Sequence, residues 1–273
     1  MSFDLEFISR NGKPAPTMNA ITVWAETQPN ISIEKEGEDG KISYENYDTG
    51  VHFTIYRSNE VLHLNINYCR PTFFALETAA VMGTLVSDFS LLVNDPDDED
   101  AKKIEYDADA LIEWWKEGNH YGCKVLKSIG QDVHWMEESK TTELWHYLRE
   151  RSQIVEEYDE YFVPKVSVVL LDDRVLRGAH LTRPTHYVVP PVDIFWLQNG
   201  NIVSAERVLS VLKPYLTKLE GFDGLNAVSE DTCFDTDVMD VWESMYDTLT
   251  PDFEMSQIEG KGLGMDGFVD VIL

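Results

Sequence analysis

The chain has few basic residues, and one long stretch has none. Of its 273 residues, 49 are Asp or Glu and only 22 are Lys or Arg, which gives a formal net charge of −27. No Lys or Arg occurs between Leu219 and Gly260. Such a charge repels DNA, RNA and anionic lipid and speeds the encounter with basic molecules. The composition argues against nucleic-acid or membrane binding and favours a basic protein partner, although adaptation to high salt or selection for solubility produces the same bias.

Cysteines are scarce, and long apolar runs are missing. Cys69, Cys123 and Cys233 are odd in number, far apart and outside any CxxC pair, as is typical of reduced thiols in the cytoplasm. Cys69 adjoins Arg70 before an expected helix, a setting that lowers a thiol pKa, but its place at a strand end favours a buried structural thiol. No run approaches the roughly 18 apolar residues of a membrane helix, and the first residues lack the features of a signal peptide. We expect a cytoplasmic protein that does not bind membranes.

The first half of the chain alternates between apolar and polar residues, as strands do. Phe3, Leu5 and Phe7 share one side of a strand, and 31–33 with 42–44 form a hairpin around a polar turn. The spacing then predicts a helix from Pro71 to about Ser87, with Phe74 and Leu85 directed inward. Further helices are expected over 107–118 and 139–161, with a loop over 118–130 between them.

The second half mixes short apolar strands with helices. Val166–Leu171 reads as a buried strand. A later helix over 237–248 directs Val238, Trp242 and Met245 inward. The glycine-rich segment 260–267 is expected to be a loop or a tail, and 268–273 one edge strand.

These elements predict an α+β fold, a mainly antiparallel sheet with helices on one face. The chain forms either one continuous domain or two lobes, 1–162 and 163–273, joined near Tyr161 to Pro164. Arg-Pro-Thr occurs at 70–72 and again at 183–185 and hints at related lobes. The surrounding residues do not match, which favours coincidence.

No motif of an active site or metal site is complete. Gly262, Gly264 and Gly267 fit GxGxxG, but the chain ends at Leu273, before any helix that would bind a phosphate. The acids of 95–100 lack the glycine and the last glutamate of a calcium loop. HExxH, zinc-ligand pairs and GxSxG are also missing. We therefore expect no catalytic residue, no cofactor and no metal ion.

Glu77 is the single carboxylate that the pattern places inside the protein. It lies on the Pro71–Ser87 helix beside apolar residues, where Arg70 is a suitable partner. It is either an acid in a cleft or part of a structural ion pair, and the ion pair is favoured.

Several segments resemble uncharacterised bacterial proteins of the immunity type, which are encoded near polymorphic toxins or secretion-system effectors. The segments are 65–77, 89–96, Val163-Pro164 and Pro190-Pro191-Val192-Asp193. The resemblance implies a protein that neutralises a toxin and transfers no catalytic residue. It agrees with the charge, because an acidic surface binds a basic effector fast and tightly.

We therefore expect a non-enzymatic, acidic binding protein that neutralises a basic partner. The alternatives are an enzyme whose acidic cleft acts on a cationic or metal-bound substrate, and a nucleic-acid mimic that inhibits a DNA-binding protein. Partner contacts are expected where acids lack basic neighbours and, in the second segment, where aromatic residues are interleaved with them. These residues are Asp97, Asp98, Glu99, Asp100, Glu230, Asp231, Phe234, Asp235, Asp237, Glu243 and Tyr246.

Overall fold

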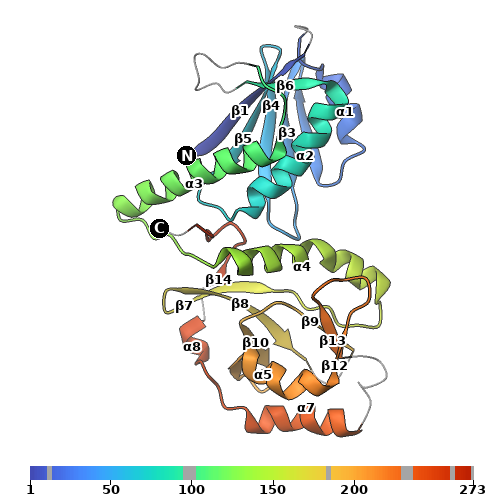
Figure 1. Ribbon diagram of the computed structural model, residues 1–273, viewed down its shortest axis with the longest axis vertical. Coiled ribbons are helices and arrows are strands. Elements are labelled where there is room, and N and C mark those ends of the chain that lie inside the picture. The colour runs from blue at the N-terminus through green and yellow to red at the C-terminus, as the bar shows by residue number, and fades with distance from the viewer. Residues whose placement is uncertain (11–13, 95–102, 183–185, 229–235, 259–261, 272–273) are drawn as a thin grey trace. The chain divides into compact units, whose positions relative to one another are not determined.

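The computed structural model describes residues 1–10, 14–94, 103–182, 186–228, 236–258 and 262–271. The chain forms two compact units, Met1–Val133 with Phe268–Leu273 (unit 1) and His134–Gly267 (unit 2), shown in Figure 1. Both combine helices with mainly antiparallel sheets, which confirms the α+β prediction. The division comes before the predicted boundary at 162, because helix α4 (Glu138–Glu157) packs with unit 2. Its Tyr147 hydroxyl donates a hydrogen bond to the Pro164 carbonyl at 2.6 Å.

Unit 1 is built on a six-stranded antiparallel sheet. Its strand order is β2-β3-β4-β5-β1-β6. The strands are β1 Ser2–Ser9, β2 Ile31–Glu36, β3 Asp39–Glu45, β4 His52–Ser58, β5 Val61–Asn67 and β6 Leu91–Asn94. The predicted hairpin is confirmed, because Ile33 pairs with Ile42 across β2 and β3. Every second residue of β1 and β5 is buried, so only one face of this sheet is fully covered.

Helix α2 (Phe73–Phe89) covers the buried face, and α1 (Met18–Ala25) and α3 (Ala108–Ser128) lie beside it (Figure 1). The predicted inward side of this helix is confirmed, since Phe74 and Leu85 are fully buried. The start of α2 is held by Asp270, whose carboxylate accepts hydrogen bonds from the Thr72 amide and hydroxyl at 2.9–3.0 Å. Phe268 packs edge-on against Phe73. The described end of the chain therefore packs into unit 1 and is not the predicted edge strand.

Glu77 joins α2 to β3 through neutral hydrogen-bond donors. Its Oε2 accepts hydrogen bonds from the Tyr44 hydroxyl at 2.8 Å and from the Asn46 amide at 3.2 Å. A buried carboxylate held in this way links the helix to the sheet.

Helix α3 continues well past the point where the sequence predicted its end. The expected loop over 118–130 is helical as far as Ser128. Gly118 does not end the helix. It allows the Tyr68 side chain to pack closely against α3, because a Cβ at this position would lie 2.1 Å from the Tyr68 hydroxyl oxygen. The prediction was wrong because a glycine that permits close approach looks, in sequence, like one that ends a helix.

Unit 2 contains two sheets. One has the order β11-β10-β8-β7-β14, and the other has the order β12-β13-β9. The strands are β7 Ser167–Leu171, β8 Arg174–Leu181, β9 Tyr187–Val189, β10 Ile194–Leu197, β11 Ile202–Ser204, β12 Leu216–Lys218, β13 Asn226–Val228 and β14 Gly262–Leu263. Among neighbouring strands of these two sheets, only β8 and β10 run parallel. Strand β14 falls in the segment that was expected to be a loop or tail, where it pairs with β7 at the sheet edge.

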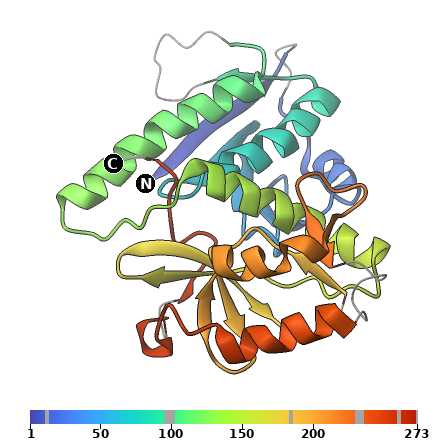
Figure 2. The ribbon, with the colours of Figure 1, turned by 60° about the horizontal axis from the view of Figure 1, so that its bottom comes forward.

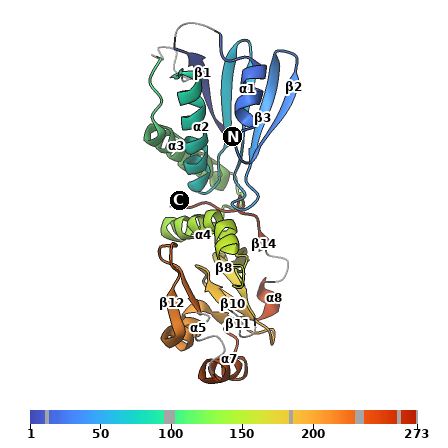
Figure 3. The same ribbon diagram turned by 90° about the vertical axis from the view of Figure 1, so that its right-hand side faces the viewer.

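Helices lie on both sides of the five-stranded sheet, in contrast to the one-sided cover of unit 1. Helix α4 lies on one side, and α5 (Ala205–Leu212) and α7 (Thr236–Thr248) lie on the other (Figures 1 and 3). Figure 2 shows α5 and α7 next to each other, and the short helix α8 (Met255–Ile258) follows them in the chain. Strand β8 is buried along most of its length for this reason. The differing strand orders give the two units different topologies, and the second Arg-Pro-Thr lies outside the described residues.

In the described part of the chain, no helix is both long enough and apolar enough to cross a membrane.

The protein should lose stability at high pH, because buried tyrosines must ionise on unfolding. Burial, together with the charge of Glu77, raises the pKa of Tyr44 to about 12, and burial also raises the pKa of Tyr106 and Tyr147. Above pH 10 the unfolded chain loses these protons while the folded chain keeps them, so stability falls as pH rises from 10 towards 12. Urea unfolding at pH 8, 10 and 11.5 measures the loss. A Tyr44→Phe variant should lose less between pH 8 and 11.5 than wild type, and an equal loss would contradict the assignment to Tyr44.

Candidate functional site

Three of the expected contact residues lie in the described structure, and all three belong to α7. They are Asp237, Glu243 and Tyr246. The remaining expected residues lie outside the described residues, namely Asp97, Asp98, Glu99, Asp100, Glu230, Asp231, Phe234 and Asp235. The candidate surface can therefore be assessed on α7.

Helix α7 has an apolar face and an acidic face. Val238, Trp242 and Met245 are at most 1% exposed, as the sequence predicted. The carboxylates recur every three or four residues on the opposite side and are exposed to solvent. We call this the α7 acidic face, and it consists of Asp237, Asp240, Glu243 and Asp247.

Two residues of the α7 acidic face, Glu243 and Asp247, lower the stability of their own helix. Glu243 and Asp247 are four residues apart, where like charges repel, and Asp247 lies in the last turn, where the helix dipole disfavours an anion. No basic residue lies in that turn. Among the described residues, none forms an ion pair with Asp240, Glu243 or Asp247. Folding of α7 therefore gives no reason for this charge pattern.

Tyr246 was expected to face a partner, but its hydroxyl group is turned towards the backbone of unit 2. Its hydroxyl lies 3.0 Å from the Thr182 carbonyl and 3.3 Å from the Leu181 carbonyl. The Trp242 indole donates hydrogen bonds to the same Thr182 carbonyl at 2.9 Å and to the Tyr246 hydroxyl oxygen at 3.2 Å. Tyr246 is half-buried against the core of unit 2. The helical period alone does not reveal that its hydroxyl finds backbone acceptors at the end of β8.

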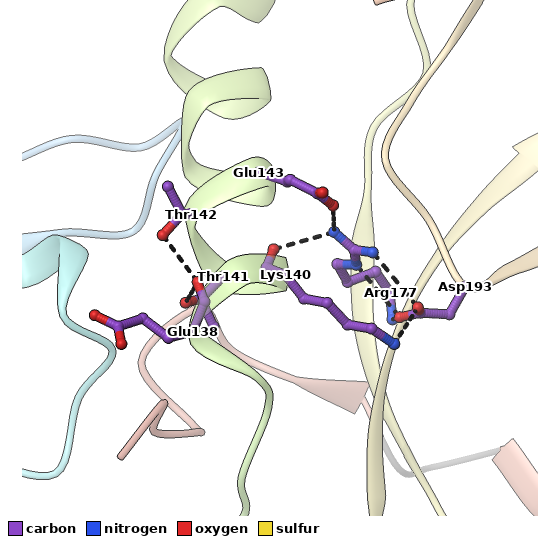
Figure 4. A network of polar contacts seen from close by, with 7 residues as sticks. All are labelled: Glu138, Lys140, Thr141, Thr142, Glu143, Arg177 and Asp193. Atoms are coloured by element: carbon purple, nitrogen blue, oxygen red, sulfur yellow. Dashed lines mark hydrogen bonds and ion pairs between the residues drawn. The ribbon is translucent and has the colours of Figure 1, made fainter. Parts of the chain in front are cut away.

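A polar network that the sequence analysis missed joins α4 to the sheet (Figure 4). Arg177 on β8 is 4% exposed, and its Nε donates to Asp193 Oδ2 at 3.3 Å. Its Nη1 donates to Glu143 Oε2 and to the Lys140 carbonyl, both at 3.0 Å. Lys140 Nζ approaches Asp193 Oδ1 to 2.7 Å. In the sequence, Arg177 stands among the apolar residues of 175–181, and an arginine inside an apolar strand indicates a buried charge that needs a partner.

Asp193 is ionised in this network. Burial by itself would raise the pKa of its carboxyl. The Arg177 guanidinium and backbone N–H, with the Lys140 ammonium, outweigh that effect and hold the pKa below its ordinary value. A buried arginine compensated in this way is a structural element of unit 2.

A pocket opens beside the network on α4. Its volume is about 570 Å³, and its lining includes Glu143, His146, Glu150 and Asp223. Glu143 belongs to both features, because its carboxylate reaches Arg177 and is also 61% exposed. We call this cavity the α4 pocket. Its three carboxylates suit a cationic group such as an amine or a guanidinium.

Groups of three or more His, Cys, Asp or Glu side chains placed to hold a metal ion do not occur among the described residues. Comparison of the chain with protein-family models, with curated proteins and with solved structures finds no match. A function for this protein is therefore inferred from the charge of the chain and from the side chains of unit 2.

Proposed function

We propose that this protein is a non-enzymatic binding protein that neutralises a basic protein partner, as immunity proteins neutralise bacterial toxins or effectors. The α7 acidic face carries the proposal. Asp240, Glu243 and Asp247 are exposed and form no ion pair among the described residues, and Glu243 with Asp247 act against helix stability, so a partner explains these charges better than folding does. The net charge of −27 adds long-range attraction for a basic protein.

The expected interface combines charges that steer encounter with a smaller apolar contact. Met239 lies on the solvent side of α7 next to the acidic residues and is 38% exposed. Carboxylates around it would set orientation and association rate, whereas methionine supplies adaptable apolar contact. Tyr246 is half-buried against the core, so it offers a partner less aromatic surface than the sequence predicted.

Charge reversal on α7 tests the proposal. The protein, carrying an affinity tag, is first used to isolate a basic binding protein from cells that encode it. Association with that protein is then measured by stopped flow at 20 and 200 mM salt. The double variant Asp240→Lys/Glu243→Lys should associate at least about tenfold more slowly at low salt, with a flatter salt dependence.

The matched control reverses two acids on α3 of unit 1. Glu113→Lys/Glu117→Lys changes the net charge by the same amount on another helix. It should retain most of the wild-type rate. An equal slowing by both variants would show that total charge acts without an α7 interface, and unchanged rates in the α7 variant would exclude this face.

The α4 pocket favours a second candidate, an enzyme that acts on a cationic substrate. His146 lies among Glu143, Glu150 and Asp223, and histidine with carboxylates is a usual set for proton transfer. Turnover of small amines or basic peptides, abolished by His146→Gln but kept in the α7 variant, would support this candidate. Competition between the protein and duplex DNA for one DNA-binding protein would instead support the nucleic-acid mimic.

A further inference from the structure

Two thiols from distant parts of the sequence meet inside unit 1. Cys69 lies in the turn between β5 and α2, and Cys123 lies on α3. Both cysteines contact Asn119, whose Oδ1 accepts a hydrogen bond from the Cys69 amide and lies 3.9 Å from the Cys123 sulfur. Both cysteines are free of disulfide bonds. Cys123 is fully buried, whereas Cys69 is half-buried, so reagents reach the pair from the Cys69 side.

Asn119 holds the Cys69 turn against α3. This asparagine is fully buried, and its Oδ1 accepts the Cys69 amide at 2.5 Å while its Nδ2 donates to the Arg70 carbonyl at 3.0 Å. The Cys123 sulfur lies 3.9 Å from the same Oδ1, one helical turn further along. Cys69 has a φ of +60°, which costs energy in a residue with a side chain. The Asn119 hydrogen bonds stabilise this conformation and place the two sulfurs together.

The surroundings give the two thiols different roles. The neighbouring Cys123 thiol and the Arg70 guanidinium, against the opposing effect of burial, lower the pKa of Cys69 to about 7. The neighbouring Cys69 sulfur, with burial, raises the pKa of Cys123 well above its ordinary value. Near neutral pH a substantial fraction of Cys69 is therefore thiolate, beside a Cys123 that stays protonated.

We propose that Cys69 and Cys123 form a redox-active dithiol, a modification site at which a peroxide converts the pair into a disulfide. The Cys69 thiolate attacks one peroxide oxygen, the O–O bond breaks, and Cys69 becomes a sulfenic acid while the leaving hydroxide takes a proton from solvent to form water. The Cys123 sulfur then attacks the Cys69 sulfur, losing its proton as the S–O bond breaks and a second water leaves. The two thiols lose two electrons in total, and the peroxide gains them.

The disulfide would join the β5–α2 turn to α3 covalently. That turn precedes the Phe73 and Phe74 core of unit 1. This inference does not depend on the proposed binding function, because the α7 acidic face belongs to unit 2.

Peroxide treatment of the full chain tests the proposal. Reduced protein is exposed to a small excess of hydrogen peroxide, blocked with N-ethylmaleimide and mapped by mass spectrometry. We expect the loss of two of the three thiols, a linked Cys69–Cys123 peptide, and Cys233 recovered with the blocking group. A disulfide to Cys233, or the recovery of Cys69 and Cys123 with the blocking group, would overturn the proposal.

A variant separates the two steps of the reaction. In Cys123→Ser the sulfenic acid on Cys69 has no resolving thiol, so it should accumulate and react with dimedone. In Cys69→Ser the buried Cys123 should stay reduced under the same treatment. Oxidation of Cys123 in Cys69→Ser at the wild-type rate would show that Cys69 is not the first thiol to react. The wild-type peptide map decides the proposal even if either variant folds poorly.

Discussion

Replacing Asp193 with alanine should lower the free energy of unfolding by about 3–5 kcal/mol. The substitution removes the carboxylate that faces the Arg177 guanidinium, and Arg177 is 4% exposed and cannot turn to water without moving the α4 contact. Most of the loss comes from leaving a buried charge without its main partner. Urea unfolding followed by far-ultraviolet circular dichroism at pH 7 measures it.

Two further variants separate this charge effect from a simple loss of packing. Asp193→Asn keeps hydrogen-bond acceptance but removes the charge, so it should cost less than alanine. The double variant Arg177→Met/Asp193→Leu removes both charges and should recover much of the stability. A cost below about 1 kcal/mol for Asp193→Ala would mean that solvent reaches Arg177 and compensates its charge.

Replacing Phe74 with alanine should lower the free energy of unfolding by about 3–5 kcal/mol. Its side chain is fully buried on α2, with ring centroids of Phe73 and His52 at 5.6 and 5.4 Å. Truncation leaves a cavity between the helix and the sheet that neighbouring rings fill only in part. The same unfolding measurement, read with the fluorescence of the tryptophans of unit 1, reports the loss.

Phe89 provides the matched control for Phe74. It is the last residue of the same helix and is half-buried, so Phe89→Ala removes the same atoms from a partly solvated site. It should cost clearly less than Phe74→Ala. Equal costs for the two variants would contradict the inward orientation assigned to Phe74.

The fold class and most elements of unit 1 follow from local sequence pattern. Alternation in β1 and β5 predicts which side chains are buried, and the period of α2 and α7 identifies Phe74 and Trp242 as core residues. These patterns succeed because each element buries one face and leaves the other in water. The division between the units was less accurate, because residues 134–162 join unit 2 through contacts such as Tyr147 with Pro164.

The candidate site was predictable in its charge and not in its details. Sequence identified Asp237 and Glu243 as exposed acids of a helix, and both are exposed. It did not identify the contact of the Tyr246 hydroxyl with the Thr182 carbonyl, or the network of Arg177 and Asp193, because those partners are distant in sequence.

The sequence by itself determined the α+β class, the acidity and the inward faces of the amphipathic elements, since period and composition are local properties. Tertiary structure decided which buried polar side chains have hydrogen-bond or ion-pair partners. Glu77 is held by Tyr44, Arg177 by Asp193, and Cys69 by Asn119 and Cys123. The physical reason is that the cost of burying a polar group depends on the atoms around it, and those atoms come from chain segments that only folding brings together.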